Sequence, residues 1–137
     1  MASIRREVRI AAQPETAWAA LRDVGALHRR LVPGFVTDTR LEEGARIVTF
    51  GNGMVVRERI VDVDDDARRV AWSAVGTTMT HHNASAQVFP DGAGGCRFVW
   101  IADLLPDEVA PQIAAMIEQG IAVIQQTLER AERERAA

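Results

Sequence analysis

Apolar and polar residues alternate along most of the middle of the chain, in short segments that are separated by polar turns. The segments occupy residues 35–41, 45–50, 54–63, 69–75, 78–89 and 96–104. The breaks between them read "EEG", "GNG", "DDDAR", "GT" and "PDGAGG", and Gly, Asn and Asp are typical of tight turns. No break is long enough for a crossover helix, so the pattern predicts an antiparallel meander. A further, imperfect strand is predicted at residues 3–10.

Helical patterns flank this series of strands. Pro14 suits the first turn of a short helix, where its missing N–H costs nothing. Asp23 is expected to cap a second short helix over residues 24–31. From Pro106 onwards, apolar residues recur at helical spacing over several turns: Val109, Ile113, Met116, Ile117, Ile121, Ile124 and Leu128. The charged tail, residues 129–137, is expected to extend into solvent.

This order of elements defines the fold class, which is α+β. A curved sheet of seven antiparallel strands cannot bury its inner face alone, and the long amphipathic helix has one apolar stripe with which to cover it. We therefore expect a helix-grip fold, with one domain over residues 1–137 and a cavity between sheet and helix. Gly120 lies inside the long helix and costs about 1 kcal/mol relative to alanine. It either widens the cavity or lets the helix approach the sheet closely.

Two adjacent histidines, His81 and His82, lie on the segment 78–89. Successive strand residues face opposite sides of a sheet, and His82 shares its side with apolar residues: Ala84, Ala86 and Val88. Asn83, Ser85 and Gln87 share the side of His81 and are expected to be accessible. His82 is thus expected to point inwards and His81 outwards. Because the two rings diverge and no other ligands have suitable spacing, we expect no metal site.

The same alternation identifies the other residues that face the interior. Glu58 is placed inwards because the opposite phase would bury two arginines, Arg57 and Arg59, and each buried charge needs a partner. The candidate catalytic residues are His82 and Glu58. The candidate ligand-binding residues are Val56, Glu58, Trp72, His82, Ala84, Phe98, Trp100, Ile113, Ile117 and Ile121. Each candidate also has a purely structural interpretation. His82 can be a buried histidine that is hydrogen-bonded to the backbone or to water, and Glu58 can be a surface carboxylate paired with Arg57 or Arg59. Trp72 and Trp100 can simply fill the core.

Composition narrows the range of partners and compartments. The formal net charge of −3 implies no basic surface, so we expect neither nucleic acid nor an anionic membrane as a partner. Cys96 is the only cysteine, which favours a reducing compartment and excludes an internal disulfide. We expect no nucleophilic role for Cys96, because its one basic neighbour points away. The start of the chain lacks the apolar core of a signal peptide, and no segment is long enough to insert in a membrane. A cytoplasmic protein without a cofactor is therefore expected.

Four segments carry a family resemblance: "PETAWAALRDVGALHRRLVPG", "VTFGNGMVVRERIVDVDDDARRVAWS", "THHNASAQVFPDG" and "CRFVWIADLLPDE". Through them the chain resembles the SRPBCC superfamily, which includes START lipid-transfer domains and birch-pollen-allergen proteins, and within it the polyketide cyclase/dehydrase branch. The resemblance implies a cavity for lipid- or polyketide-like small molecules, in which a few members catalyse aldol cyclisation or dehydration. In related plant hormone receptors a glutamate in a similar "ERL" stretch faces the cavity, and "ERI" puts Glu58 there. A tyrosine of those receptors lies near the position of His82, while their gate loops are not recognisable in "FGNGM".

Three functions stay open on the sequence. The first is binding or carriage of one apolar small molecule in the cavity. The second is a cyclase or dehydratase in which His82 acts as the base and Glu58 orients it. The third is an interaction module, a homodimer formed through the sheet edge or through an outer face where Val99 and Ile101 are exposed. Proton-transfer catalysis needs positioned acid and base groups, and only two candidates exist, so the sequence favours binding.

Overall fold

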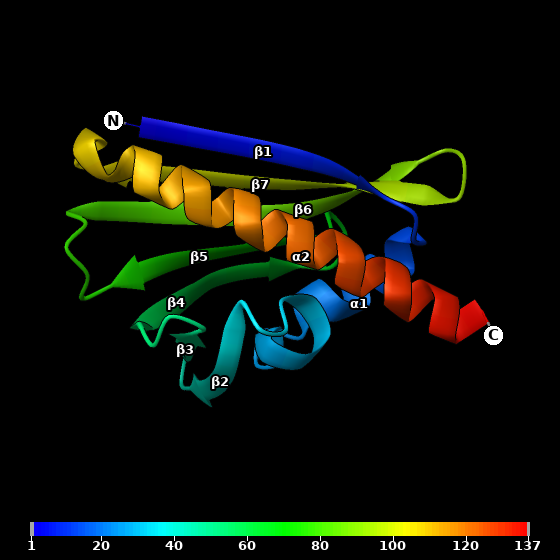
Figure 1. Cartoon of the computed structure of the whole chain (residues 1–137), viewed down its shortest axis with the longest axis horizontal. Coiled ribbons are helices and arrows are strands. Elements are labelled where there is room, and N and C mark those ends of the chain that lie inside the picture. The colour runs from blue at the N-terminus through cyan, green and yellow to red at the C-terminus, as the bar shows by residue number, and fades with distance from the viewer. Residues whose placement is uncertain (1, 137) are drawn as a thin grey trace.

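All seven strands form one antiparallel sheet in the computed structural model, which describes residues 2–136. The strand order is β1-β7-β6-β5-β4-β3-β2, so that β2 to β7 follow the chain and β1 joins the edge beside β7 (Figure 1). The strands are β1 (Ala2–Ile10), β2 (Val36–Glu42), β3 (Ala45–Phe50), β4 (Val55–Asp64), β5 (Arg69–Val75), β6 (His81–Asp91) and β7 (Gly95–Leu105). The predicted meander and its additional N-terminal strand are confirmed.

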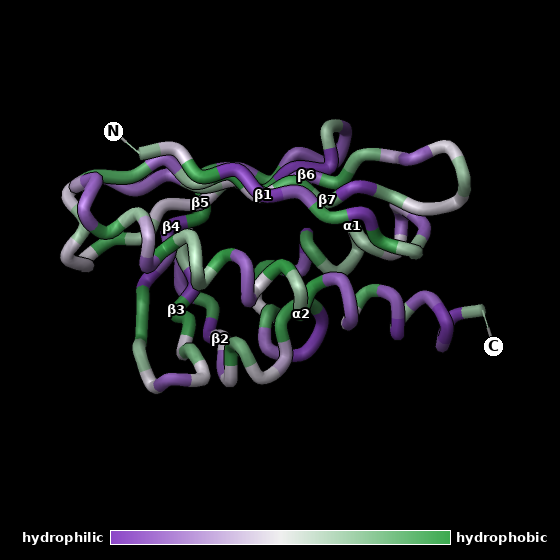
Figure 2. The backbone as a smooth tube through the Cα atoms, turned by 45° about the horizontal axis from the view of Figure 1, so that its top comes forward, coloured by the Kyte–Doolittle hydropathy of each residue, from purple (hydrophilic) through white to green (hydrophobic). Residues whose placement is uncertain are grey.

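The long helix α2 (Ala110–Ala136) lies across the inner face of the sheet and packs chiefly along β1 (Figure 1). A single 3-10 turn, η2 (Asp107–Val109), precedes it. Figure 2 shows two layers, with β2 and β3 curving out of the plane of the other strands towards the helix. The core between the layers includes Phe98 and Leu104 of the sheet and Ile124 and Leu128 of α2. Within residues 2–136, no helix is both long enough and apolar enough to cross a membrane.

The two short helices differ in how well they follow the prediction. Helix α1 (Pro14–Arg22) begins at its proline as expected. The second short helix is present but shorter than predicted: within residues 24–31 the chain forms one π-helical turn, η1 (Leu27–Leu31). The predicted cap is wrong, because Asp23 binds the Arg30 guanidinium and Ala26 is the residue at the start of the turn. A Cβ on Gly25 would lie 2.8 Å from Leu41 Cδ1. This segment is therefore shaped by its contact with β2, which local propensity does not encode.

The charged tail is also placed differently from its prediction. Helix α2 continues to Ala136, and two of its carboxylates bind the corner between β1 and α1; Ala137 lies outside the described residues. Glu129 accepts a hydrogen bond from the Ala11 N–H at 2.9 Å, and Glu132 accepts one from the Gln13 N–H at 2.7 Å. Gln13 is the N-cap residue of α1, and N–H groups at the start of a helix lack partners within it, so the Gln13 N–H is a good donor for Glu132. The prediction that the whole tail extends into solvent is therefore wrong.

The outer face of the sheet is less accessible than alternation predicts. Ser85 is 8% exposed and Val99 is 4% exposed, so the expected exposure of these two residues is wrong. Val99 lies between Glu7 and Gln87 in the strand register, and Glu7 binds Arg97 at 3.1 Å. These long side chains surround the small ones on the central strands. The outer face consequently offers no exposed Val99 for a dimer contact.

Candidate functional site

A cavity of about 170 Å³ lies between the sheet and the N-terminal half of α2, and we call it the outer chamber. Seven of the predicted binding residues line it: Val56, Glu58, Trp72, His82, Trp100, Ile113 and Ile117. A smaller cavity of about 60 Å³, the inner chamber, lies deeper and includes Phe98 in its wall. Ala84 and Ile121 line neither chamber and are buried in the core. Both chambers thus lie where the fold places a ligand cavity, with a wall close to the predicted one.

His82 reaches the outer chamber from β6 and is held there by the neighbouring strand. The ladder between β5 and β6 ends at the pair Trp72 and Ala84, and beyond it the Ala74 N–H donates to His82 Nδ1 at 2.9 Å. The Ser73 hydroxyl donates to the His82 carbonyl. Because a backbone N–H can only donate, Nδ1 is unprotonated, and the neutral ring carries its proton on Nε2.

The electrostatic surroundings keep His82 neutral. Burial lowers the pKa of His82 below its usual value, and this effect outweighs the nearby Glu58 carboxylate, which acts in the opposite direction. With Nδ1 bound to the backbone, Nε2–H is the group that His82 can offer to a molecule in the chamber. Its natural partner is a hydrogen-bond acceptor such as a carbonyl oxygen.

Glu58 is buried and paired with an arginine that the sequence analysis did not identify. Arg46 Nε donates to Glu58 Oε1 at 2.8 Å, and the two side chains are 4% and 11% exposed. The two residues are cross-strand partners on β3 and β4. The guanidinium lies over the Trp72 ring, 5.3 Å from its centroid, and also donates to the Val24 carbonyl. Glu58 is therefore not a surface carboxylate paired with Arg57, which binds Glu42 instead.

A signal for Arg46 was available in the sequence. In "ARIVTF", Arg46 shares one face of the strand with Val48 and Phe50, and an apolar face is an inward one. Other residues of the outer chamber lie where the pattern predicts strands that begin later in the structure. Met54 lies just before β4, and Thr77, Thr78 and Met79 lie in the loop between β5 and β6, although strands are predicted from residues 54 and 78. The loop that carries Met79 and both threonines has no period, so alternation does not predict that all three line the chamber.

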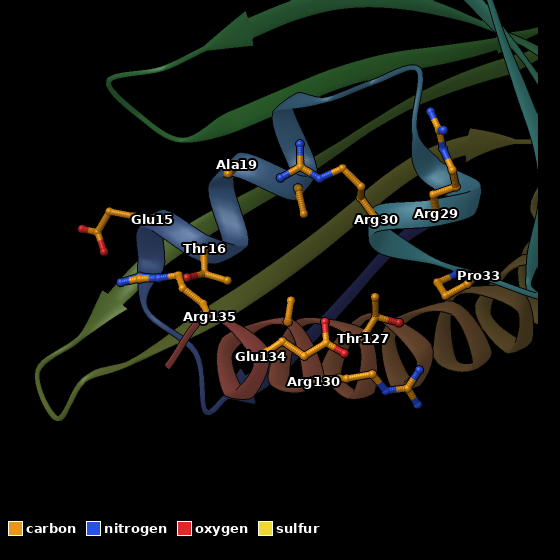
Figure 3. Close-up of a pocket in the computed structure, with 12 residues that line it drawn as sticks. Glu15, Thr16, Ala19, Arg29, Arg30, Pro33, Thr127, Arg130, Glu134 and Arg135 are labelled. Atoms are coloured by element: carbon orange, nitrogen blue, oxygen red, sulfur yellow. The ribbon is translucent and has the colours of Figure 1, made fainter. Parts of the chain in front are cut away.

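A larger hollow on the surface lies outside this cavity. It has a volume of about 620 Å³ and is bounded by α1, η1 and the last turns of α2 (Figure 3). Four arginines line it, but their side chains do not converge: Figure 3 shows Arg29 and Arg130 pointing in different directions, and Arg30 binds Asp23 at 3.0 Å. The hollow therefore lacks the convergent donors that an anion site needs.

The other reactive residues are separate from the cavity. Burial raises the pKa of the Cys96 thiol to about 11, so the thiolate needed for nucleophilic chemistry is scarce near neutral pH. Across residues 2–136, no three His, Cys, Asp or Glu side chains gather in a way that could hold a metal ion. The titratable groups of the two chambers are thus His82, Glu58 and Arg46.

Comparison with known proteins gives one family and many solved structures. The sequence profile of the family described as "Polyketide cyclase / dehydrase and lipid transport" matches residues 1–134. A protein from Thermobifida fusca, solved by NMR, is 28% identical with a TM-score of 0.80, over 97% of this chain and 95% of that one. The Zhui aromatase/cyclase from Streptomyces sp. R1128 is 17% identical with a TM-score of 0.75, over 99% and 96%.

A third similar structure is norcoclaurine synthase from Thalictrum flavum in complex with dopamine and hydroxybenzaldehyde. It is 19% identical with a TM-score of 0.74, and the match covers 97% of this chain and 87% of that chain. Comparison with curated protein sequences finds no match. Identities below one quarter establish a shared fold, which agrees with the helix-grip architecture.

Proposed function

The chain belongs to the family described as polyketide cyclase / dehydrase and lipid transport, and from this premise we propose that it binds a small, mostly apolar molecule in the outer chamber. The ligand carries a hydrogen-bond acceptor, such as a carbonyl oxygen, that meets His82. The observation that carries this proposal is the hydrogen bond from the Ala74 N–H to His82 Nδ1, which leaves Nε2–H as a donor in a mostly apolar cavity.

The volume of the chamber restricts the size of the ligand. An engineered apolar cavity of about 150 Å³ in another protein binds benzene, whereas pockets for drug-sized ligands measure about 300–1,000 Å³. At about 170 Å³, the outer chamber suits a molecule of one or two rings. A long lipid chain or a multi-ring polyketide requires side chains to move first. Among the lipid- and polyketide-like molecules that the family implies, we therefore expect only the smallest to bind.

The polar groups restrict the chemistry of the ligand. His82 offers a donor from β6, and Glu58 lies on β4, with β5 between them. Two strand spacings separate these backbones by about 10 Å, so one ligand group or a water can lie between the side chains. Arg46 occupies Glu58 Oε1, and Oε2 has no hydrogen-bond partner among residues 2–136. A ligand hydroxyl can donate to that oxygen.

A neighbouring structure supports this ligand class. The norcoclaurine synthase of similar fold is solved with dopamine and hydroxybenzaldehyde, which are both single aromatic rings with polar substituents. Such molecules match the chamber in size and in the mixture of apolar surface and hydrogen-bonding groups.

Catalysis of cyclisation or dehydration is the alternative, and the site is less suited to it. The expected role of His82 as base requires a free lone pair towards the substrate, but its lone pair on Nδ1 is bound to Ala74. Glu58 is held by Arg46, which occupies one of its carboxylate oxygens. Binding therefore accounts better for the groups in the chamber.

The test compares two probes of similar size, acetophenone and ethylbenzene, of which only the first carries a carbonyl. We expect isothermal titration calorimetry to show tighter binding of acetophenone than of ethylbenzene. His82→Phe should weaken the binding of acetophenone by about 1–3 kcal/mol, the range for losing a buried hydrogen-bond partner. The binding of ethylbenzene should change much less. His81→Phe is the matched control and should leave both affinities near wild type, because His81 is exposed. Equal effects of the two histidine substitutions would contradict the proposal.

A further inference from the structure

The outer and inner chambers are separated by aromatic side chains. Five residues line both chambers, and four of them are aromatic: Phe35, Phe50, Trp72 and Trp100, with Glu58. The Trp72 and Trp100 rings lie 6.1 Å apart between centroids, and the Phe35 and Phe50 rings lie 5.7 Å apart with an edge-to-face geometry. Their positions therefore determine how far a molecule in the outer chamber can extend inwards.

This aromatic partition lies very close to α2 at Gly120. A Cβ built on Gly120 would lie 2.9 Å from Trp100 Cζ3 and 3.3 Å from Phe35 Cε2. The first distance is shorter than normal contacts between carbon atoms, so a side chain at this position would push one or both rings away from the helix. Glycine is disfavoured inside a helix relative to alanine, and this close approach gives it a packing reason here.

We propose that Gly120 is a specificity-determining residue, which sets the size of the ligand by letting Trp100 and Phe35 rest against α2. An alanine there moves the rings into the chambers that they line and shortens the available space. This inference rests on the proposed function, since it concerns the size limit of the same cavity. It requires no contact between Gly120 and the ligand, because the helix acts through the two rings.

The test uses two hydrocarbons that differ in length, benzene and naphthalene, so that the hydrogen bond of His82 has no part in the result. We expect Gly120→Ala to lower the affinity for naphthalene, relative to the affinity for benzene, by about tenfold or more, because the displaced rings would overpack the site. Thermal unfolding of the free protein should show that the variant is folded. Ala122→Gly is the matched control. Ala122 is exposed on the same helix, so this substitution changes helix propensity without affecting the rings.

A rescue variant separates the proposed contact from a general loss of structure. Phenylalanine lacks the outer ring atoms of Trp100 that approach Gly120, so Gly120→Ala combined with Trp100→Phe should recover naphthalene binding. If the wild type binds neither hydrocarbon, the proposed function fails and this inference fails with it. If binding is intact but Gly120→Ala leaves the ratio of the two affinities unchanged, or the double variant does not recover it, this inference alone is overturned.

Discussion

His81 and His82 are adjacent in the chain, yet the structure gives them different environments. His81 is exposed, whereas His82 is part-buried and accepts a hydrogen bond from the Ala74 backbone. Strand alternation predicts this difference in direction from the apolar neighbours of His82. It does not predict the protonated nitrogen, because that depends on the end of the ladder between β5 and β6.

The lowered pKa of His82 has a consequence for stability. Burial disfavours the charged ring in the folded protein, whereas the unfolded chain takes up the proton near pH 6.5. As the pH falls below this value the unfolded state binds more protons, so the stability contributed by neutral His82 is lost on acidification. We expect urea unfolding at pH 7.5 and pH 5.5 to show a larger loss of stability in the wild type than in His82→Phe. An identical loss in both proteins would contradict the burial of a neutral His82.

The ion pair of Arg46 and Glu58 leads to a second prediction at this scale. Arg46→Met leaves a buried carboxylate without its partner, and removal of one member of such a pair typically costs about 3–5 kcal/mol. Replacing both residues with apolar ones, as in Arg46→Met with Glu58→Leu, should cost much less. Denaturant unfolding of the wild type, the single variant and the double variant measures the difference. A double variant that loses as much stability as Arg46→Met alone would contradict the prediction.

At the scale of elements, the strands could be predicted well and the short helical segments less so. Each strand carries its own alternation and its own turn residues, as in "GNG" between β3 and β4. The turn η1 arises from tertiary packing, in which Leu41 fills the space beside Gly25. The end of α2 also depends on tertiary contacts. Its charge pattern predicts a solvated tail, but Glu132 binds the start of α1.

Glu132 provides the N-terminal cap that α1 lacks locally. Its carboxylate accepts hydrogen bonds from the Gln13 N–H and from the Thr16 hydroxyl at 2.8 Å, and the Gln13 side chain makes no capping bond. We expect Glu132→Ala to lower the free energy of unfolding by about 1 kcal/mol, as for loss of a capping side chain. Denaturant unfolding measures this loss. Glu134→Ala, two residues along the same helix and exposed, should change stability little.

The effect of Glu132 also depends on pH in a defined direction. The hydrogen bond from the Gln13 N–H lowers the pKa of Glu132 below its ordinary value of 4.5. Its contribution is therefore complete above that pH and is lost as the pH falls through the lower, folded-state value. The difference in stability between wild type and Glu132→Ala should shrink on acidification below about pH 4.5. A difference that stays constant down to pH 3 would argue against the capping role of the carboxylate.

At the scale of the whole molecule, the cavity follows from the arrangement of one curved sheet and one long helix. Its position could be predicted, because Trp72 and His82 on the strands and Ile113 and Ile117 on the helix each face inwards by their own period. Its division into two chambers could not, since that depends on how the rings of Trp72 on β5 and Trp100 on β7 meet across β6, the strand between them. The interior is thus largely encoded in local patterns, while the shape of the binding space depends on packing between elements.

The most direct test of ligand binding in this cavity is to locate a bound probe by NMR. We expect acetophenone to give intermolecular nuclear Overhauser effects to the methyl groups of Ile113 and Ile117 and to the rings of Trp72 and Trp100, all of which line the outer chamber. Effects confined to Thr127 and other residues of the surface hollow beside α1, or none at saturating probe, would contradict the account.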